Sequence, residues 1–269
     1  MSKPLIIAVA PNGARHSKSD IQHLPITPQE LAETAERCAD QGATMIHLHV
    51  RDAQHKHSLE PEFYRPAIAA VSEAVKDRML IQVTSEAAGV YVAQEQIRLI
   101  LQLMPGCVSI GLREYVSMDK GYSDFSNFIR RLYDAGTLIQ YILYDDNDYR
   151  IYQKLLEDKV IPGDRHSLLV VIGRYLQAEP SVKDLSDYDR LLSTVPDSMV
   201  CTFGSQSPEI LLRCAARGHH VRLGFENSTR MSDTNDAEHN DDLVADFASL
   251  QENSRGLATY EQTLVMLGG

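Results

Sequence analysis

The sequence lacks several patterns that mark whole classes of protein. No segment has the 18 consecutive apolar residues typical of a membrane-spanning helix. Basic residues are few, since 26 Lys and Arg stand against 37 Asp and Glu, and the net charge of -11 argues against a nucleic-acid-binding surface. The segment from Met1 into the apolar run Leu5–Val9 lacks the length and the cleavage site of a secretory signal. We therefore expect a cytoplasmic protein that binds neither nucleic acid nor a membrane.

Cysteine and glycine patterns exclude further kinds of site. The four cysteines form no Cys-x-x-Cys pair, so we interpret them as reduced thiols in or near the core. No Gly-x-Gly-x-x-Gly follows a predicted strand and no Gly-x-x-x-x-Gly-Lys-Ser/Thr occurs, which argues against a nucleotide-binding Rossmann fold.

The chain has 269 residues, 43% of them hydrophobic, and no internal repeats or linker-like segments. We expect residues 1–269 to form one domain with a full core.

What the sequence does contain is a regular alternation of short apolar runs with helical patterns. Eight runs are predicted as strands: Leu5–Ala10, Met45–Val50, Met79–Thr84, Cys107–Ile110, Leu138–Leu143, Leu168–Ile172, Met199–Phe203 and Val221–Phe225. The first predicted helix opens with a capping box at Thr27-Pro28-Gln29-Glu30, and the others lie near Pro61–Lys76, Val92–Leu103, Ser123–Ala135, Tyr149–Asp158, Pro208–Arg217, Leu243–Asn253 and Thr259–Leu267. Eight strand–helix units in about 250 residues are what a closed (β/α)₈ barrel of the TIM type requires. An open doubly wound sheet is the alternative.

The segment Ile46-His47-Leu48-His49-Val50-Arg51-Asp52 carries the strongest chemical pattern. Side chains two residues apart in a strand point the same way, so His47 and His49 face one side. Two imidazoles at one depth in an apolar strand need polar partners, and a metal ion satisfies both. The alternative is a pair of core histidines held by hydrogen bonds.

A third metal ligand is predicted after the last strand. Active sites of (β/α)₈ barrels lie at the carboxyl ends of the strands. By alternation Arg222 and Glu226 share a face, so if Arg222 points into the barrel, Glu226 lies beside the two histidines. Two histidines and one carboxylate leave coordination positions open, which suits catalysis. We expect zinc, with iron(II) as the alternative.

Several segments spread over nearly the whole chain carry a family resemblance: Ala10–Arg15, Leu24–Thr27, Gly42–Asp52, Gly218, Val221–Asn227 and Asn240–Val244. They resemble the corresponding segments of the β-keto acid cleavage enzymes. The resemblance implies a TIM-type barrel, zinc held by His47, His49 and Glu226, and a homo-oligomer, either a dimer or a tetramer. It also implies the reaction, in which a β-keto acid and acetyl-CoA give acetoacetate and the CoA thioester of the shortened acid.

The resemblance also implies roles for residues around the metal. Arg222 matches the family's catalytic arginine, and a buried arginine in a barrel strand needs an anionic partner in any case. Thr84 and Ser109 match hydroxyl-bearing substrate contacts, although both could be ordinary hydroxyls at strand ends.

The substrate's charge is predicted from Arg15. This residue matches a position where the family's aminohexanoate-cleaving member has a glutamate that faces the substrate's ammonium group. The reversed sign predicts a neutral or acidic β-keto acid, such as a keto-diacid, with Arg174 or Arg113 as further anion contacts. The alternative is that Arg15 pairs with a nearby carboxylate such as Asp20.

One position departs from the family's pattern. Many relatives carry Asp directly after the metal-binding Glu, where it partners the catalytic Arg in proton transfer, but this chain has Asn227. Because an amide cannot take that proton, we assign Asn227 to substrate binding and Glu86 to the role of general base, with Glu114 as second candidate. The alternative is that Glu86 pairs structurally with Arg51 or Arg113.

Two other functions are compatible with a metal-binding barrel. A zinc-dependent hydrolase or lyase is one, although zinc amidohydrolases need further histidines after later strands, where this chain has Tyr144-Asp145-Asp146 and Gly173-Arg174. A barrel that binds a metal or a small acid without catalysis is the other. The Asp- and Asn-rich segment Ser232–Asp242 is expected to be a solvated loop or, alternatively, a mobile lid. His57, His219 and His220 are expected at the surface.

Overall fold

Eight parallel strands close into a barrel in chain order, so that β1 pairs with both β2 and β8. The computed structural model describes residues 3–116, 121–163, 166–173, 185–251 and 255–268. The strands are β1 Ile7–Val9, β2 Met45–Leu48, β3 Leu80–Thr84, β4 Cys107–Gly111, β5 Leu138–Leu143, β6 Ser167–Ile172, β7 Met199–Thr202 and β8 His220–Leu223. The predicted closed barrel is confirmed, and the open doubly wound sheet is wrong.

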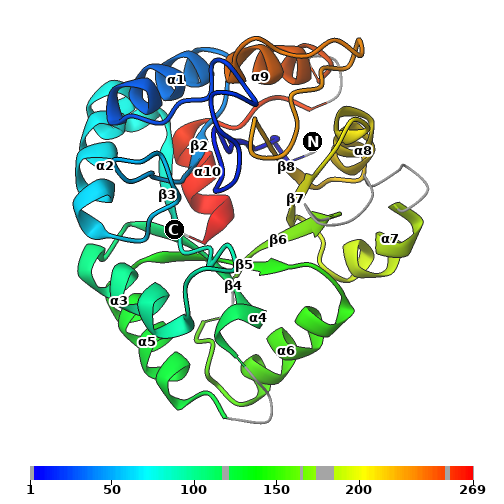
Figure 1. Ribbon diagram of the computed structural model, residues 1–269. Coiled ribbons are helices and arrows are strands. Elements are labelled where there is room, and N and C mark those ends of the chain that lie inside the picture. The colour runs from blue at the N-terminus through cyan, green and yellow to red at the C-terminus, as the bar shows by residue number, and fades with distance from the viewer. Residues whose placement is uncertain (1–2, 117–120, 164–165, 174–184, 252–254, 269) are drawn as a thin grey trace.

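Helices form a ring outside the strands, as Figure 1 shows in a view along the barrel. They are α1 Pro28–Asp40, α2 Pro61–Val75, α3 Ala93–Leu103, α4 Leu112–Tyr115, α5 Ser123–Asp134, α6 Asp146–Glu157, α7 Leu185–Thr194, α8 Ser207–Ala216, α9 Asn240–Ser249 and α10 Tyr260–Leu267, with a 3₁₀ turn at Lys76–Arg78. The prediction lacked α4 and α7. Helix α4 has only four residues, fewer than two helical turns, and α7 buries only three side chains, so neither shows a clear apolar period. No helix in the described part of the chain combines the length and the apolar character needed to cross a membrane.

Helix α1 begins where the capping box predicts. Glu30 N donates to Thr27 Oγ1 over 3.2 Å, and the Glu30 carboxylate accepts from Thr27 N over 2.9 Å. These bonds satisfy amide groups that have no partner within the helix. The start of helix α1 is therefore determined by local sequence.

The barrel encloses an apolar interior in its amino-terminal half. Alternate strand residues point inward and pack on one another, among them Ile6, Ala8, Met45, Leu80, Cys107, Leu169, Val171, Met199 and Cys201. Helix α10 crosses the middle of the ring in Figure 1, and its Leu267 belongs to the same cluster. All four cysteines are buried and free, as expected. Val171 of this cluster also lines the cavity at the carboxyl end of the barrel.

The expectation for three histidines is wrong. His219 and His220 are buried, and His57 is half-buried. His220 accepts a hydrogen bond from Ile6 N through Nδ1 over 3.1 Å, and His219 Nδ1 lies 3.1 Å from Ser198 Oγ. A buried imidazole is tolerated when such partners exist, but they are distant in sequence and give no local pattern.

His220 should make stability depend on pH. Burial, reinforced by the cationic Arg255, lowers the pKa of His220 from 6.5 to about 4. The unfolded chain therefore binds a proton between these values that the folded chain does not, so the free energy of unfolding falls as pH drops through this window. The expected contribution is about 1.4 kcal/mol per pH unit. Urea denaturation at pH 7 and at pH 5 should give a smaller difference for His220→Gln than for the unchanged protein, and equal differences would contradict this assignment.

The Asp- and Asn-rich segment after β8 is largely a solvated loop, which is the first of the two structures predicted for Ser232–Asp242. Residues 232–236 are exposed and form turns, and α9 begins at Asn240. Ser232 N and Oγ donate to the carboxylate of Asp246, which attaches the loop to α9.

Candidate active site and metal centre

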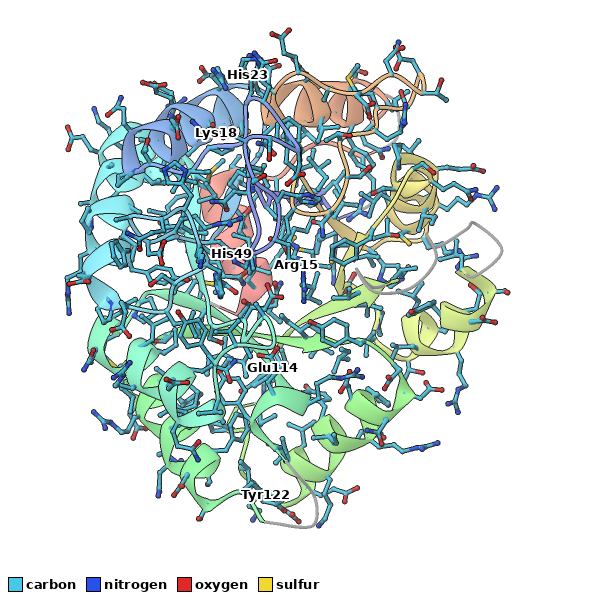
Figure 2. All side chains as sticks on the ribbon, in the orientation of Figure 1. Arg15, Lys18, His23, His49, Glu114 and Tyr122 are labelled. Atoms are coloured by element: carbon cyan, nitrogen blue, oxygen red, sulfur yellow. The ribbon has the colours of Figure 1, made fainter. Side chains whose placement is uncertain are left out.

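A cavity of about 240 Å³ lies where the carboxyl ends of the strands meet. It is lined by side chains from loops and strands around most of the barrel, including Arg15, His47, Thr84, Glu86, Arg113, Glu114, Tyr144, Phe203, Arg222 and Glu226. Figure 2 places Arg15, His49 and Glu114 near the axis of the ring and His23 at its periphery. The cavity is therefore at the end of the barrel where the sequence predicts the active site.

Three buried side chains converge at this cavity. His47 Nε2 and His49 Nε2 are 3.2 Å apart, and they lie 3.7 and 3.3 Å from Glu226 Oε2. Each residue offers a ligand atom within 4.8 Å of the others, so one cation could contact all three. Two imidazole nitrogens and one carboxylate are the donor set of many catalytic zinc sites. The residues present fit a divalent metal.

Glu226 reaches the histidines through a tight turn after β8. Gly224 has φ +131°, and a Cβ there would lie 2.3 Å from Ala10 O. Glu226 N donates to the same carbonyl oxygen over 3.1 Å. The strand ends at Leu223, so simple alternation does not extend to Glu226, yet the turn delivers its side chain to the predicted face. Only glycine allows the two loops to approach this closely.

Arg222 holds Glu226 in the ionised state. Its Nη2 donates to Glu226 Oε1 over 2.9 Å and to Cys201 Sγ over 3.3 Å. Burial alone raises the pKa of Glu226, but the Arg222 guanidinium beside it holds this pKa well below its usual range. Burial, together with Arg222, lowers the pKa of His47 to about 3. At neutral pH the site therefore presents an anionic carboxylate and a neutral imidazole, as metal binding requires.

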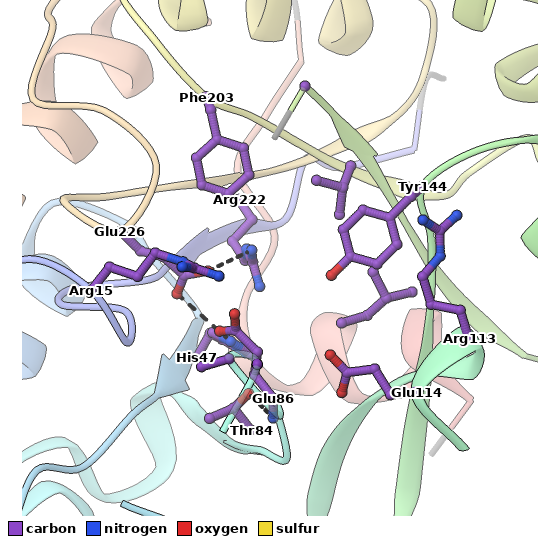
Figure 3. Close-up of a pocket in the computed structure, with 15 residues that line it drawn as sticks. Arg15, His47, Thr84, Glu86, Arg113, Glu114, Tyr144, Phe203, Arg222 and Glu226 are labelled. Atoms are coloured by element: carbon purple, nitrogen blue, oxygen red, sulfur yellow. Dashed lines mark hydrogen bonds and ion pairs between the residues drawn. The ribbon is translucent and has the colours of Figure 1, made fainter. Parts of the chain in front are cut away.

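Glu86 lines the same cavity, as Figure 3 shows. Its Oε2 lies 3.7 Å from His49 Nε2, and burial raises the pKa of its carboxyl group. Its backbone N donates to Thr84 Oγ1 over 3.1 Å. The two arginines considered as structural partners have other contacts: Arg113 binds Asp145 and Asp148, and Arg51 donates to the carbonyl oxygens of Gly13 and His16. The geometry places the Glu86 carboxylate beside the candidate metal ligands.

Only two of the four other predicted substrate contacts line the cavity. Arg15 and Thr84 line the cavity, whereas Ser109 and Asn227 are buried and are not among the lining residues. Ser109 Oγ and both amide atoms of Asn227 have no hydrogen-bond partner among the described residues. Asp20, the alternative partner considered for Arg15, accepts from Ser17.

The two further arginines predicted to contact the substrate contribute less to the described site. Arg113 lines the cavity, but both its Nε and its Nη2 bind Asp148. Arg174 lies outside the described residues.

Some lining residues had no role in the prediction. Tyr144 and Phe203 directly follow β5 and β7, so the rule that strand ends carry the site could have assigned both. Arg113 lies over the Tyr144 ring, 4.7 Å from its centroid.

Glu114, the second candidate base, accepts from Gln96 Nε2 and Ala87 N, and burial raises its pKa to about 7.

Comparison with known proteins identifies the family of this chain. A family model described as beta-keto acid cleavage enzyme matches residues 4–268. The chain belongs to the β-keto acid cleavage enzyme family.

Two relatives and one solved structure are also similar to this chain. The 3-keto-5-aminohexanoate cleavage enzyme of Acetoanaerobium sticklandii is 24% identical over 98% of each chain. The 3-oxoadipate:acetyl-CoA acetyltransferase of Cupriavidus necator is 25% identical over 100% of this chain and 96% of its own. The ternary complex of ObcA with a C4-CoA adduct and oxalate has a TM-score of 0.68 and 13% identity, covering 92% of this chain and 68% of that one. This last likeness concerns the fold alone.

A second group of possible metal ligands lies away from the cavity. His23 and Glu238 are exposed and His239 is half-buried, with His23 Nε2 3.5 Å from Glu238 Oε1. The contact is that of an ordinary surface ion pair, which contributes little to stability. It provides a control for metal-binding experiments.

Proposed function

We propose that this enzyme transfers the acyl group of a β-keto acid to CoA, with acetyl-CoA as the second substrate. The acetyl group passes from CoA to C2 of the keto acid, and the released CoA thiolate adds to C3. The C2–C3 bond then breaks, so the products are acetoacetate and the CoA thioester of the shortened acid. The observation that carries the proposal is the convergence of His47, His49, Glu226 and Arg222 on one cavity. The name of the Cupriavidus relative, an acetyl-CoA acetyltransferase, supports acetyl-CoA as co-substrate.

His47, His49 and Glu226 would hold one zinc ion per chain. A bound zinc ion supplies Lewis acidity that polarises the ketone of a β-keto acid. Zinc is preferred to iron(II) because two histidines and a glutamate form an established catalytic zinc set, although non-haem iron enzymes use a similar triad.

The chain's own residues orient the keto acid and stabilise negative charge. The Arg222 guanidinium lines the cavity and supplies a fixed positive charge near the ketone oxygen, where negative charge develops. Thr84 Oγ1 accepts from Glu86 N, so its hydrogen is directed to another acceptor, which we assign to a substrate oxygen. Ser109 and Asn227 are proposed as further polar contacts, since their polar atoms are buried without partners among the described residues.

Glu86 is proposed as the general base. The new carbon–carbon bond forms at C2 of the keto acid, so a proton must leave that carbon. The Glu86 carboxylate lies in the cavity wall near the residues that would bind the ketone, within reach of a substrate held there. Asn227 cannot take this role because its amide has no basic oxygen.

The proposed function is tested by incubating the purified protein with acetyl-CoA and neutral, acidic and cationic β-keto acids. Acetoacetate and the new acyl-CoA, measured by mass spectrometry, are expected in equal amounts for at least one keto acid. Cleavage that proceeds without acetyl-CoA would instead indicate a hydrolase. The absence of thioester product with every keto acid would favour a barrel that binds a metal or a small acid without catalysis.

Arg15 is proposed to select the charge of the substrate. We expect 3-oxoadipate, the keto-diacid in the name of the Cupriavidus relative, to be used better than a cationic keto acid. Arg15→Ala should lower kcat/KM for the keto-diacid by about 10- to 100-fold, the effect of losing a charged hydrogen bond. A neutral keto acid of equal length should change by less than about threefold, because it makes no such bond.

Arg15→Lys is the matched control, since it keeps the charge and loses only the planar guanidinium. It should retain part of the preference for the keto-diacid. Equal losses for charged and neutral substrates in Arg15→Ala would contradict the assignment.

We further propose that residues 1–269 form a single domain, and that the enzyme is a cytoplasmic homo-oligomer, either a dimer or a tetramer. Light scattering coupled to size-exclusion chromatography measures the number of subunits directly. A mass of one chain would contradict the oligomer.

A further inference from the structure

A chain of hydrogen bonds crosses the interior of the barrel behind His47. His47 Nδ1 lies 2.8 Å from Gln82 Oε1, Gln82 Nε2 lies 3.2 Å from Gln140 Oε1, and Gln140 Nε2 lies 3.0 Å from Ser167 Oγ. The residues come from β2, β3, β5 and β6, and all four are buried. Two buried glutamine side chains in a largely apolar barrel cost desolvation energy unless their hydrogen bonds are complete.

The bond to Gln82 determines which nitrogen of His47 carries the proton. An amide oxygen only accepts, so His47 Nδ1 must be the donor. His47 Nε2 is then unprotonated, and it faces His49 Nε2 and Glu226 Oε2. Its lone pair is the one that a metal ion at this site needs.

The orientation of the Gln82 amide depends in turn on Gln140. If the Gln82 amide were reversed, its NH₂ group would face His47 Nδ1, and its oxygen would face the acceptor oxygen of Gln140. The Gln140 amide is held in the same sense because its Nε2 also lies 3.8 Å from Met199 Sδ, which can only accept. Gln82 Nε2 lies 3.8 Å from Cys107 Sγ, a second weak acceptor. Because a thiol can also donate, the Met199 sulfur is the atom that favours one direction for the whole chain of bonds.

We propose that Gln82, held by Gln140, is a positioning residue that keeps His47 in the Nδ1–H tautomer and so prepares the metal site before any metal binds. The inference rests on the metal centre of the proposed function but not on the reaction. Residues that orient a metal-binding histidine typically change metal affinity by 10- to 100-fold when replaced.

The test compares Gln82→Met with Gln82→Glu, using Zn²⁺ as the probe in competition with a chromophoric chelator. Gln82→Met removes the acceptor and should weaken Zn²⁺ binding by about 10- to 100-fold. Gln82→Glu keeps an acceptor toward His47 Nδ1 and should retain affinity within about threefold of the unchanged protein or exceed it, because carboxylate–histidine–zinc arrangements are common. Gln140→Met should weaken binding less than Gln82→Met, since it acts through Gln82.

A second readout is the His47 tautomer in the metal-free protein, measured by ¹⁵N NMR and assigned by its loss in His47→Ala. The unchanged protein should show the proton on Nδ1, and Gln82→Met should show a mixture of tautomers. Ser198→Ala is the control, because it removes a buried contact to His219 outside this network and should alter neither readout.

Three results would overturn the inference: a proton on His47 Nε2 in the unchanged metal-free protein, Zn²⁺ affinity in Gln82→Met within about twofold of the unchanged protein, or no Zn²⁺ binding at all. Failure of the proposed reaction looks different. In that case Zn²⁺ binding and the tautomer would follow expectation, but no β-keto acid would be cleaved.

Discussion

Removal of the metal, or replacement of either His49 or Glu226, is expected to reduce acetoacetate formation by more than about 10³-fold. Loss of one hydrogen-bond donor to a developing oxyanion costs about 10²- to 10³-fold, and a divalent cation supplies a larger charge. His49→Ala and Glu226→Gln each remove one of three converging ligands, so both variants should also lose zinc. Elemental analysis of the unchanged protein should give about one zinc per chain.

His23→Ala is the matched control for metal content, since His23 belongs to the exposed ligand group outside the cavity. This variant should keep both its zinc and its activity. Reloading the chelated protein with Zn²⁺ or Fe²⁺ separates the two metals, and zinc should restore the higher rate. Active protein without any transition metal would refute the proposed centre.

Replacement of Glu86 by Gln should lower turnover by about 10²-fold or more, the usual scale for loss of a general base. Gln has nearly the same shape as Glu but cannot take a proton. The measurement is kcat with the best keto acid, together with zinc content. Zinc should remain bound, because His47, His49 and Glu226 are unchanged. Loss of zinc would instead assign Glu86 to the metal, since its Oε2 lies only 3.7 Å from His49 Nε2.

Two further variants place this result in context. Glu114→Gln is the comparison, because Glu114 also lines the cavity and is the second candidate base. It should affect turnover less than Glu86→Gln. Asn227→Asp introduces the carboxylate that the family resemblance implies directly after the metal-binding Glu, so it should partly restore turnover when combined with Glu86→Gln. Normal turnover of Glu86→Gln alone would show that proton transfer has another origin.

Elements with a local cause could be predicted closely. The strand Leu138–Leu143 agrees with β5 at both ends, and α1 begins at the residue that the capping box indicates. An apolar run between turn residues and a cap with its Glu three residues later involve only neighbours in sequence. Other strands end earlier than predicted, because Val50, Phe203 and Phe225 lie beyond the residues that pair with a neighbouring strand. Val50 and Phe225 are nevertheless buried and Phe203 lines the cavity, so an apolar pattern does not show where pairing ends.

Polar residues inside the protein were harder to assign. The burial of His220 depends on Ile6 N, a partner more than 200 positions away in the sequence. Arg113 was predicted as a contact for an anionic substrate, but it binds Asp145 and Asp148, which lie on a different loop and helix. Whether a polar side chain is buried is decided by what surrounds it after folding.

The sequence by itself determined the barrel and the common orientation of His47 and His49, because hydrophobic periodicity and the two-residue alternation of side chains are local properties. Only the tertiary structure decided how those side chains are held. The turn at Gly224 brings Glu226 to Arg222, and Gln82 faces Nδ1 of His47 from the neighbouring strand. Hydrogen-bond direction and charge depend on distances between strands, and the order of residues along one strand does not contain those distances.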